Sequence, residues 1–147
     1  GGAVSTAWPL LDLEHRQPKL SYAGLEKVDD QSLHQLKYSL KKGGGDLKIS
    51  LYFEPETGHH LLSVYKVTIA AGAGLVHTES AAQQETRFTL EEKFGAFRQV
   101  DGLTLPTRWT LRLTQESRET SLLWEWNVAF DKIIHNQAID PAHFLLH

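Results

Sequence analysis

The chain has 147 residues and a formal net charge of −3, a length that fits a single domain with a substantial core. The small net charge and the lack of a basic stripe give no electrostatic reason to expect nucleic acid or an acidic membrane as partner. The absence of cysteine excludes disulfides, thiolate metal sites and cysteine nucleophiles. We therefore treat residues 1–147 as one domain and predict no nucleic-acid partner and only peripheral membrane contact.

The first helix pattern lies close to the N-terminus. The stretch "STAWPLLDLE", residues 5–14, predicts a short helix, because Ser5 or Thr6 can cap it and Pro9 fits its first turn. A second, weaker pattern lies at the end of the chain, where residues 139–146 predict a final turn or short helix.

Most of the remaining chain shows the two-residue alternation of strands with one buried face. Val-Asp turns at Asp29-Asp30 and Asp101-Gly102 predict two similar hairpins, and residues 71–84 predict the longest loop. We expect about seven strands with mostly short connections. They are predicted at 19–28, 32–41, 47–54, 59–70, 86–97, 103–115 and 120–134.

This order of elements predicts a mainly β fold, an antiparallel meander curled into an open half-barrel. The sheet would carry about 15 inward apolar side chains, and leaving them in water would cost tens of kcal/mol. One helix of about two to three turns cannot cover so wide a face. The cover can be closure of the sheet, a sandwich, another chain, or an apolar ligand.

Large side chains of matching strand parity form the candidate ligand-binding surface. The simpler alternative for each of them is that it fills the core. An apolar ligand cavity in a half-barrel is the sharper hypothesis. The candidate lining residues are Tyr38, Ile49, Leu51, Phe88, Leu90, Trp109, Leu111, Trp124 and Trp126.

Motifs for catalysis or metal binding are absent from the sequence. The adjacent His59 and His60 diverge on a strand, and the other histidines lack metal-ligand spacing, so we predict no metal and no cofactor. The Glu91-Glu92 pair is explained by a solvated strand face. No nucleophile elbow or phosphate loop is present. The sequence therefore gives no support for an enzyme.

Three long stretches resemble the bacterial outer-membrane lipoprotein-sorting (LolA/LolB-like) superfamily. They are "LKISLYFEPETGHHLLSVYKVT", "QQETRFTLEEKFGAFRQVDGLTLPTRWTLRL" and "LLWEWNVAFDKIIHNQAIDPAHF". The shared elements are a strand ending in "YFEPETG", a "VDG-x-x-LP" turn and a closing "IDPAHF", whereas "VDD" at 28–30 departs from Val-Asp-Gly. Family members are longer, with a long N-terminal helix. The resemblance therefore implies either the C-terminal part of such a protein, truncated at its N-terminus, or a chain whose apolar face is covered from elsewhere.

The resemblance implies a half-barrel whose concave apolar face carries lipid or an acylated protein across the periplasm. It places the protein in the periplasm or at the outer membrane. No family arginine can be matched to a position here, so none is transferred. The leading hypothesis is a non-catalytic carrier that binds a lipid or the acyl chains of a lipoprotein. The alternative is an interaction module whose apolar face or sheet edge pairs with another subunit, including a second copy of the chain.

Overall fold

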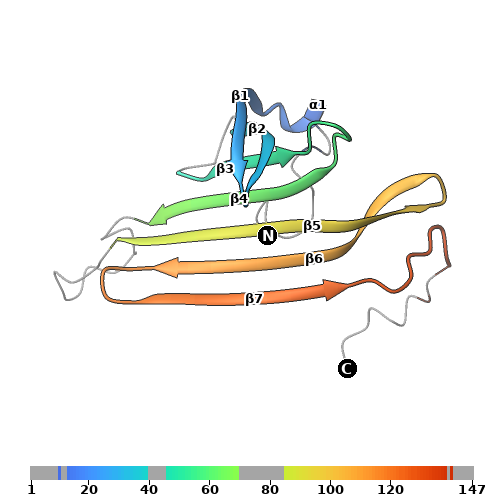
Figure 1. Cartoon of the computed structure of the whole chain (residues 1–147). Coiled ribbons are helices and arrows are strands. Elements are labelled where there is room, and N and C mark those ends of the chain that lie inside the picture. Colours follow the sequence, from blue (N-terminus) through green and yellow to red (C-terminus); the bar gives the residue numbers. More distant parts are fainter. Residues whose placement is uncertain (1–9, 11–12, 40–45, 70–84, 139, 141–147) are drawn as a thin grey trace.

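The computed structural model describes residues 10, 13–39, 46–69, 85–138 and 140, which form one antiparallel sheet and a short helix (Figure 1). The sheet has seven strands in the order of the chain, and each strand pairs with the next. The predicted fold class, mainly β with an open antiparallel meander, is confirmed. The elements are α1 (Leu13–Arg16), β1 (Lys19–Val28), β2 (Gln31–Ser39), β3 (Lys48–Phe53), β4 (His60–Ile69), β5 (Thr86–Val100), β6 (Leu103–Glu116) and β7 (Ser121–Ala129).

Several boundaries differ from the prediction. Of the helix expected at 5–14, only the end lies among the described residues, and α1 continues it to Arg16. The strand expected at 120–134 ends at Ala129, where Phe130 N–H donates to Thr107 O at 2.8 Å and the chain then leaves the sheet. The predicted loop at 71–84 and, apart from one residue, the predicted turn or helix at 139–146 lie outside the described residues.

Both Val-Asp turns are two-residue hairpins, as predicted. Val28 pairs with Gln31 across the first, and Val100 pairs with Leu103 across the second. The loop residues all have positive φ: 46° and 68° at Asp29 and Asp30, 50° and 82° at Asp101 and Gly102. Positive φ at both loop positions is the conformation that matches the twist of the flanking strands, and Asp and Gly tolerate it well. The local sequence therefore determines both turns.

The sheet is strongly twisted. In Figure 1 the strands β5, β6 and β7 run alongside one another, whereas β1 and β2 cross them steeply. The tip of the β1–β2 hairpin reaches β5, where Lys93 Nζ lies 2.5 Å from Asp29 Oδ2. The hairpin tip thus contacts a strand three places away in the sheet order.

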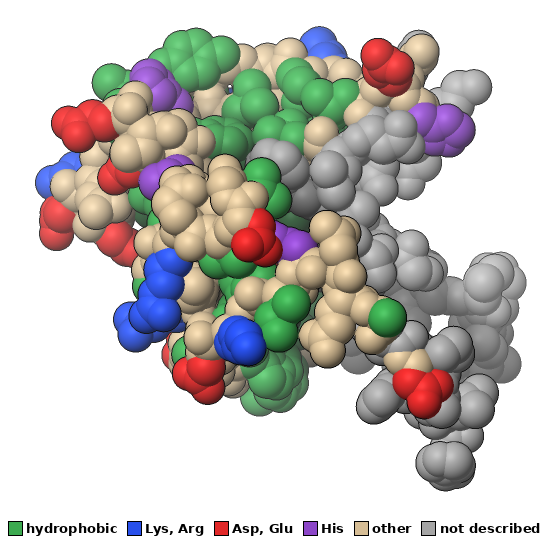
Figure 2. All heavy atoms as spheres, turned by 90° about the vertical axis from the view of Figure 1, so that its right-hand side faces the viewer, with side chains coloured by type: hydrophobic (Ala, Val, Ile, Leu, Met, Phe, Trp, Pro, Cys, Tyr) green, Lys and Arg blue, Asp and Glu red, His purple; other side chains and the backbone are tan. Residues whose placement is uncertain are grey.

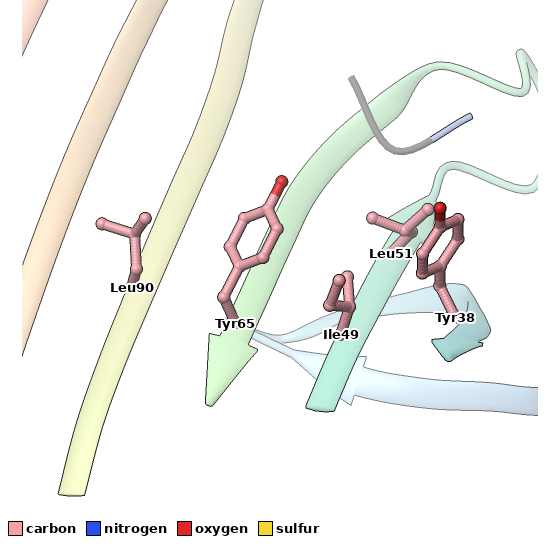
Figure 3. Close-up of a cluster of buried hydrophobic side chains, with 5 residues drawn as sticks. All are labelled: Tyr38, Ile49, Leu51, Tyr65 and Leu90. Atoms are coloured by element: carbon pink, nitrogen blue, oxygen red, sulfur yellow. The ribbon is translucent and has the colours of Figure 1, made fainter. Parts of the chain in front are cut away.

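Two apolar clusters occupy the two faces of the sheet. One consists of the buried residues Tyr38, Ile49, Leu51, Tyr65 and Leu90, whose side chains all point to the same side of β2–β5 (Figure 3). The other lies on the opposite face, beneath the hairpin tip, and consists of Leu33, Tyr52, Leu62 and Val64. The β2–β4 region therefore has a core on both sides, which sequence alternation alone does not predict.

Candidate apolar binding face

All nine predicted lining residues lie on one face of the sheet, which we call the apolar face. Residues directly opposite each other in an antiparallel pair point to the same side. The pairs Tyr38–Ile49, Ile49–Tyr65, Tyr65–Leu90, Leu90–Leu113 and Leu113–Trp124 make one such row, from β2 to β7. The adjacent row contains Leu51, Leu111 and Trp126. Phe88 lies two residues before Leu90 on β5, and Trp109 lies two residues before Leu111 on β6, so both point to the same side.

Burial changes steadily across the apolar face. Leu51 is 0% exposed and Leu90 is 8% exposed, whereas Trp124 and Trp126 on β7 are 39% and 48% exposed. Phe88, Trp109 and Leu111 lie between these extremes. Four predicted lining residues, Tyr38, Ile49, Leu51 and Leu90, are therefore core residues in this structure, and the accessible part of the face is its β6–β7 end.

The buried end of the apolar face is covered by the residues before β1. Leu10 and Leu13 pack against the cluster that contains Tyr38 and Leu51. This packing is the role expected of the N-terminal helix. This cover does not extend to β7, where Leu122 is 43% exposed and Trp124 and Trp126 are exposed as well.

Several polar residues interrupt the apolar face, and the sequence interpretation missed three of them: Ser63, Glu92 and His60. Ser63 lies opposite Leu51, and Glu92 lies opposite both Ser63 and Leu111. Glu92 has the same strand parity as Phe88, Leu90 and Phe94, so the alternation itself contained the signal. Our interpretation of Glu91-Glu92 as a solvated pair was wrong for Glu92.

The third polar residue, His60, reaches the apolar face through an irregularity in β4. Tyr52 pairs with Leu62 but Phe53 pairs with His60, so Leu61 is an extra residue in the ladder. Leu61 packs against the opposite cluster instead of joining the apolar face. His60 takes its place and lies between two aromatic rings, with centroid distances of 4.9 Å to Phe53 and 5.1 Å to Phe94.

Hydrogen bonds hold these polar groups in defined positions. Tyr65 Oη donates to Glu92 Oε2 at 2.8 Å, and His60 Nε2 lies 3.0 Å from Leu62 O and 3.1 Å from Ser63 Oγ. Burial raises the pKa of the Glu92 carboxyl and of the Tyr65 phenol, and burial lowers the pKa of His60 to about 4. His60 is therefore neutral at pH 7.

Ser63 and His60 do not form a nucleophile–base pair. A carbonyl oxygen accepts hydrogen bonds only, so the contact with Leu62 O requires the proton of the neutral imidazole on Nε2. The same nitrogen faces Ser63 Oγ and has no lone pair with which to take its proton. Ser63 is also 0% exposed. This arrangement is suited to structural hydrogen bonding and not to acyl transfer.

Two further donors on the apolar face are buried. Tyr38 Oη and Trp109 Nε1 have no hydrogen-bond partner within the part of the chain that the structure describes. Buried donors are normally paired, so these two are exceptions among the described side chains.

The opposite face of β5–β7 is polar and charged. Arg112 Nη2 lies 2.7 Å from Glu125 Oε2, and Arg112 Nη1 lies 4.0 Å from Glu91 Oε2. Hydrogen bonds from Asn127 and Arg112 lower the pKa of Glu125. In an end view of the molecule, charged side chains gather towards the left, whereas hydrophobic side chains reach the surface at the top and bottom (Figure 2). Ion pairs thus occupy the face of β5–β7 that carries Arg112.

The described residues contain neither a metal-ligating cluster nor a membrane-spanning helix. No group of three His, Asp or Glu side chains in those ranges could hold a metal ion. No helix among them has the length and hydropathy needed to cross a membrane.

Comparison with known proteins gives no match: no family model, curated protein or solved structure shows detectable similarity to this chain. The resemblance to lipoprotein-sorting proteins therefore stays a prediction from sequence motifs.

Proposed function

We propose that the protein is a non-catalytic carrier that holds the apolar chain of a lipid, or the acyl chains of a lipoprotein, against the β6–β7 end of the apolar face. The observation that carries the proposal is the exposure of Leu122, Trp124 and Trp126 side by side on the face that is core at its other end. The resemblance to lipoprotein-sorting proteins adds the expectation of a periplasmic or outer-membrane location.

The expected affinity is modest. Each buried methylene contributes about 0.8 kcal/mol, so about ten of them gain roughly 8 kcal/mol, from which several kcal/mol are lost to the entropy of association. Such a balance gives reversible binding, which suits a carrier that must release its cargo. Binding of this kind requires no catalytic group.

Adjacent leucines on β7 provide a matched test. Leu122 lies on the apolar face and Leu123, 59% exposed, lies on the opposite face, because successive strand residues alternate. We expect native mass spectrometry of the protein, purified without detergent, to show co-purified lipid. We expect Leu122→Asp to lose that added mass and Leu123→Asp to keep it. A wild-type protein that carries no lipid and takes up none from vesicles would contradict the proposal.

The second candidate is an interaction module that pairs through the β7 edge. β7 is an outer strand of the sheet, all of its residues except Val128 are exposed, and it contains neither lysine nor proline. The other outer strand, β1, has Lys19 and Lys27 and a register irregularity near Gly24, which are features that discourage edge pairing. A mass that doubles with concentration in light scattering, and falls equally in Leu122→Asp and Leu123→Asp, would favour this candidate over the carrier.

A further inference from the structure

Glu92 is an acidic residue in the middle of an apolar surface. It lies on β5 between Leu90 and Phe94 along the strand, and opposite Leu111 on β6. Its side chain is partly buried, and burial raises the pKa of its carboxyl. Placing a carboxylate in such surroundings costs free energy unless the charge is paired or well hydrogen-bonded. The position therefore calls for an explanation beyond solubility.

The described residues satisfy this carboxyl only in part. It accepts one hydrogen bond, from Tyr65 Oη at 2.8 Å, although a carboxylate has about four acceptor sites. Among the described residues, no lysine or arginine makes an ion pair with it. The cations at neighbouring ladder positions, Lys93 and Arg112, lie on the opposite face and pair with Asp29, Glu91 and Glu125.

The adjacent residue Glu91 shows the contrast. Glu91 points to the charged face, where Arg112 Nη1 lies 4.0 Å from it. Glu92 points to the apolar face, where its neighbours across the strands are Ser63 and Leu111. Two consecutive carboxylates thus have opposite surroundings, and within the described ranges only Glu91 has a cation beside it.

Indole rings lie on the same face. Trp109 is two residues from Leu111 along β6, and Trp126 pairs with Leu111 from β7. Strand spacing places these tryptophans about 7–10 Å from Glu92 between backbones. Indole faces attract cations as well as apolar chains. A carboxylate beside aromatic and aliphatic side chains is complementary to a molecule with both a cationic and an apolar part.

We propose that the apolar face selects an amphiphile with an ammonium group, which binds at Glu92 while the hydrocarbon chain lies over Leu111, Trp124 and Trp126. This inference rests on the proposed function, since it presupposes that an apolar chain binds there. Charge complementarity favours an ammonium head group over the alternatives. An anionic head group would be repelled by the Glu92 carboxylate, and a neutral head group would leave that carboxylate without a cation.

Three amphiphiles with the same chain test the selection: dodecylammonium, dodecanol and dodecanoate. The two ions are kept below their micelle concentrations and the alcohol below its solubility limit, and binding is measured by calorimetry at neutral pH. We expect dodecylammonium to bind the wild-type protein about tenfold more tightly than the other two, the equivalent of one charge-assisted contact. Glu92→Gln should remove this preference and leave dodecanol binding intact, which also shows that the variant is folded. Glu91→Gln should keep the preference.

The outcomes separate the two proposals. If none of the three amphiphiles binds, the carrier proposal fails. The carrier proposal stands, but the ammonium site at Glu92 is overturned, in two cases. In the first, dodecanol binds the wild-type protein as tightly as dodecylammonium does. In the second, Glu92→Gln still binds dodecylammonium more tightly than dodecanol.

Discussion

His60 is the clearest case in which one residue links the fold to pH. Its imidazole is buried between Phe53 and Phe94 and is neutral because burial lowers its pKa from 6.5 to about 4. In the unfolded chain the imidazole takes up its proton near pH 6.5, before the folded protein does. The unfolded state therefore binds more protons between these two pKa values, and stability is lost as the pH falls through this range.

We predict that His60→Gln weakens this pH dependence. The shift corresponds to a loss of roughly 3 kcal/mol in the free energy of unfolding between about pH 6.5 and pH 4. Glutamine keeps a donor near Leu62 O and does not titrate. Urea unfolding at neutral and acidic pH measures the free energy of unfolding of the wild-type protein and of His60→Gln. The raised pKa of Glu92 affects the pH dependence of both proteins alike, so it does not alter the comparison. Parallel curves for the two proteins would contradict this role of His60.

Single residues were also where sequence reasoning was weakest. The alternation around Phe88, Leu90 and Phe94 placed Glu92 on the apolar face. Acidic residues are almost always solvated, and for that reason Glu92 was assigned to the solvated face. The extra residue in β4 was not visible at all, because Leu61 and His60 fit either face by composition. Irregularities that depend on the pairing strand are not encoded in the local pattern.

At the scale of strands, the sequence was more informative. Period-two alternation found every strand that the structure describes, and the Val-Asp turns fixed two hairpins. The end of β7 was predicted five residues too far, at 134 instead of 129, because apolar residues continue beyond the last pair with β6. Pairing partners, and not local hydrophobicity, determine where that strand stops.

The strands also divide the apolar face into a part that stabilises the fold and a part available for binding. Leu51 on β3 is 0% exposed, whereas Trp126 on β7 is 48% exposed. We predict that Leu51→Ala lowers the free energy of unfolding by about 2–5 kcal/mol, as expected of a large-to-small change in a core. We predict that Trp126→Ala lowers it by less than about 1 kcal/mol but weakens binding of an acyl chain about tenfold.

Urea unfolding and calorimetric titration with dodecanol measure the two effects. The division is refuted if Trp126→Ala destabilises the protein as much as Leu51→Ala. It is also refuted if Trp126→Ala binds dodecanol as well as the wild-type protein does.

For the whole molecule, the sequence predicted the architecture but not which parts of the two sheet faces are buried. The open antiparallel meander follows from short connections and alternating strands. The hairpin tip that packs on the opposite face, with Asp29 against Lys93, required contacts between strands far apart in the sheet order. All nine predicted lining residues share one face, which is core at its β2–β5 end and exposed at its β7 end.

The central claim is that an apolar chain lies directly on the β6–β7 end of this face. The chain has four tryptophans, and in Trp8→Phe the remaining ones, Trp109, Trp124 and Trp126, all lie on the apolar face. Brominated acyl chains quench tryptophan fluorescence only on contact, so titration of this variant with a brominated dodecyl amphiphile tests the claim most directly. The account predicts strong, saturable quenching that the unbrominated analogue does not produce; quenching no greater than that of free tryptophan in solution would contradict it.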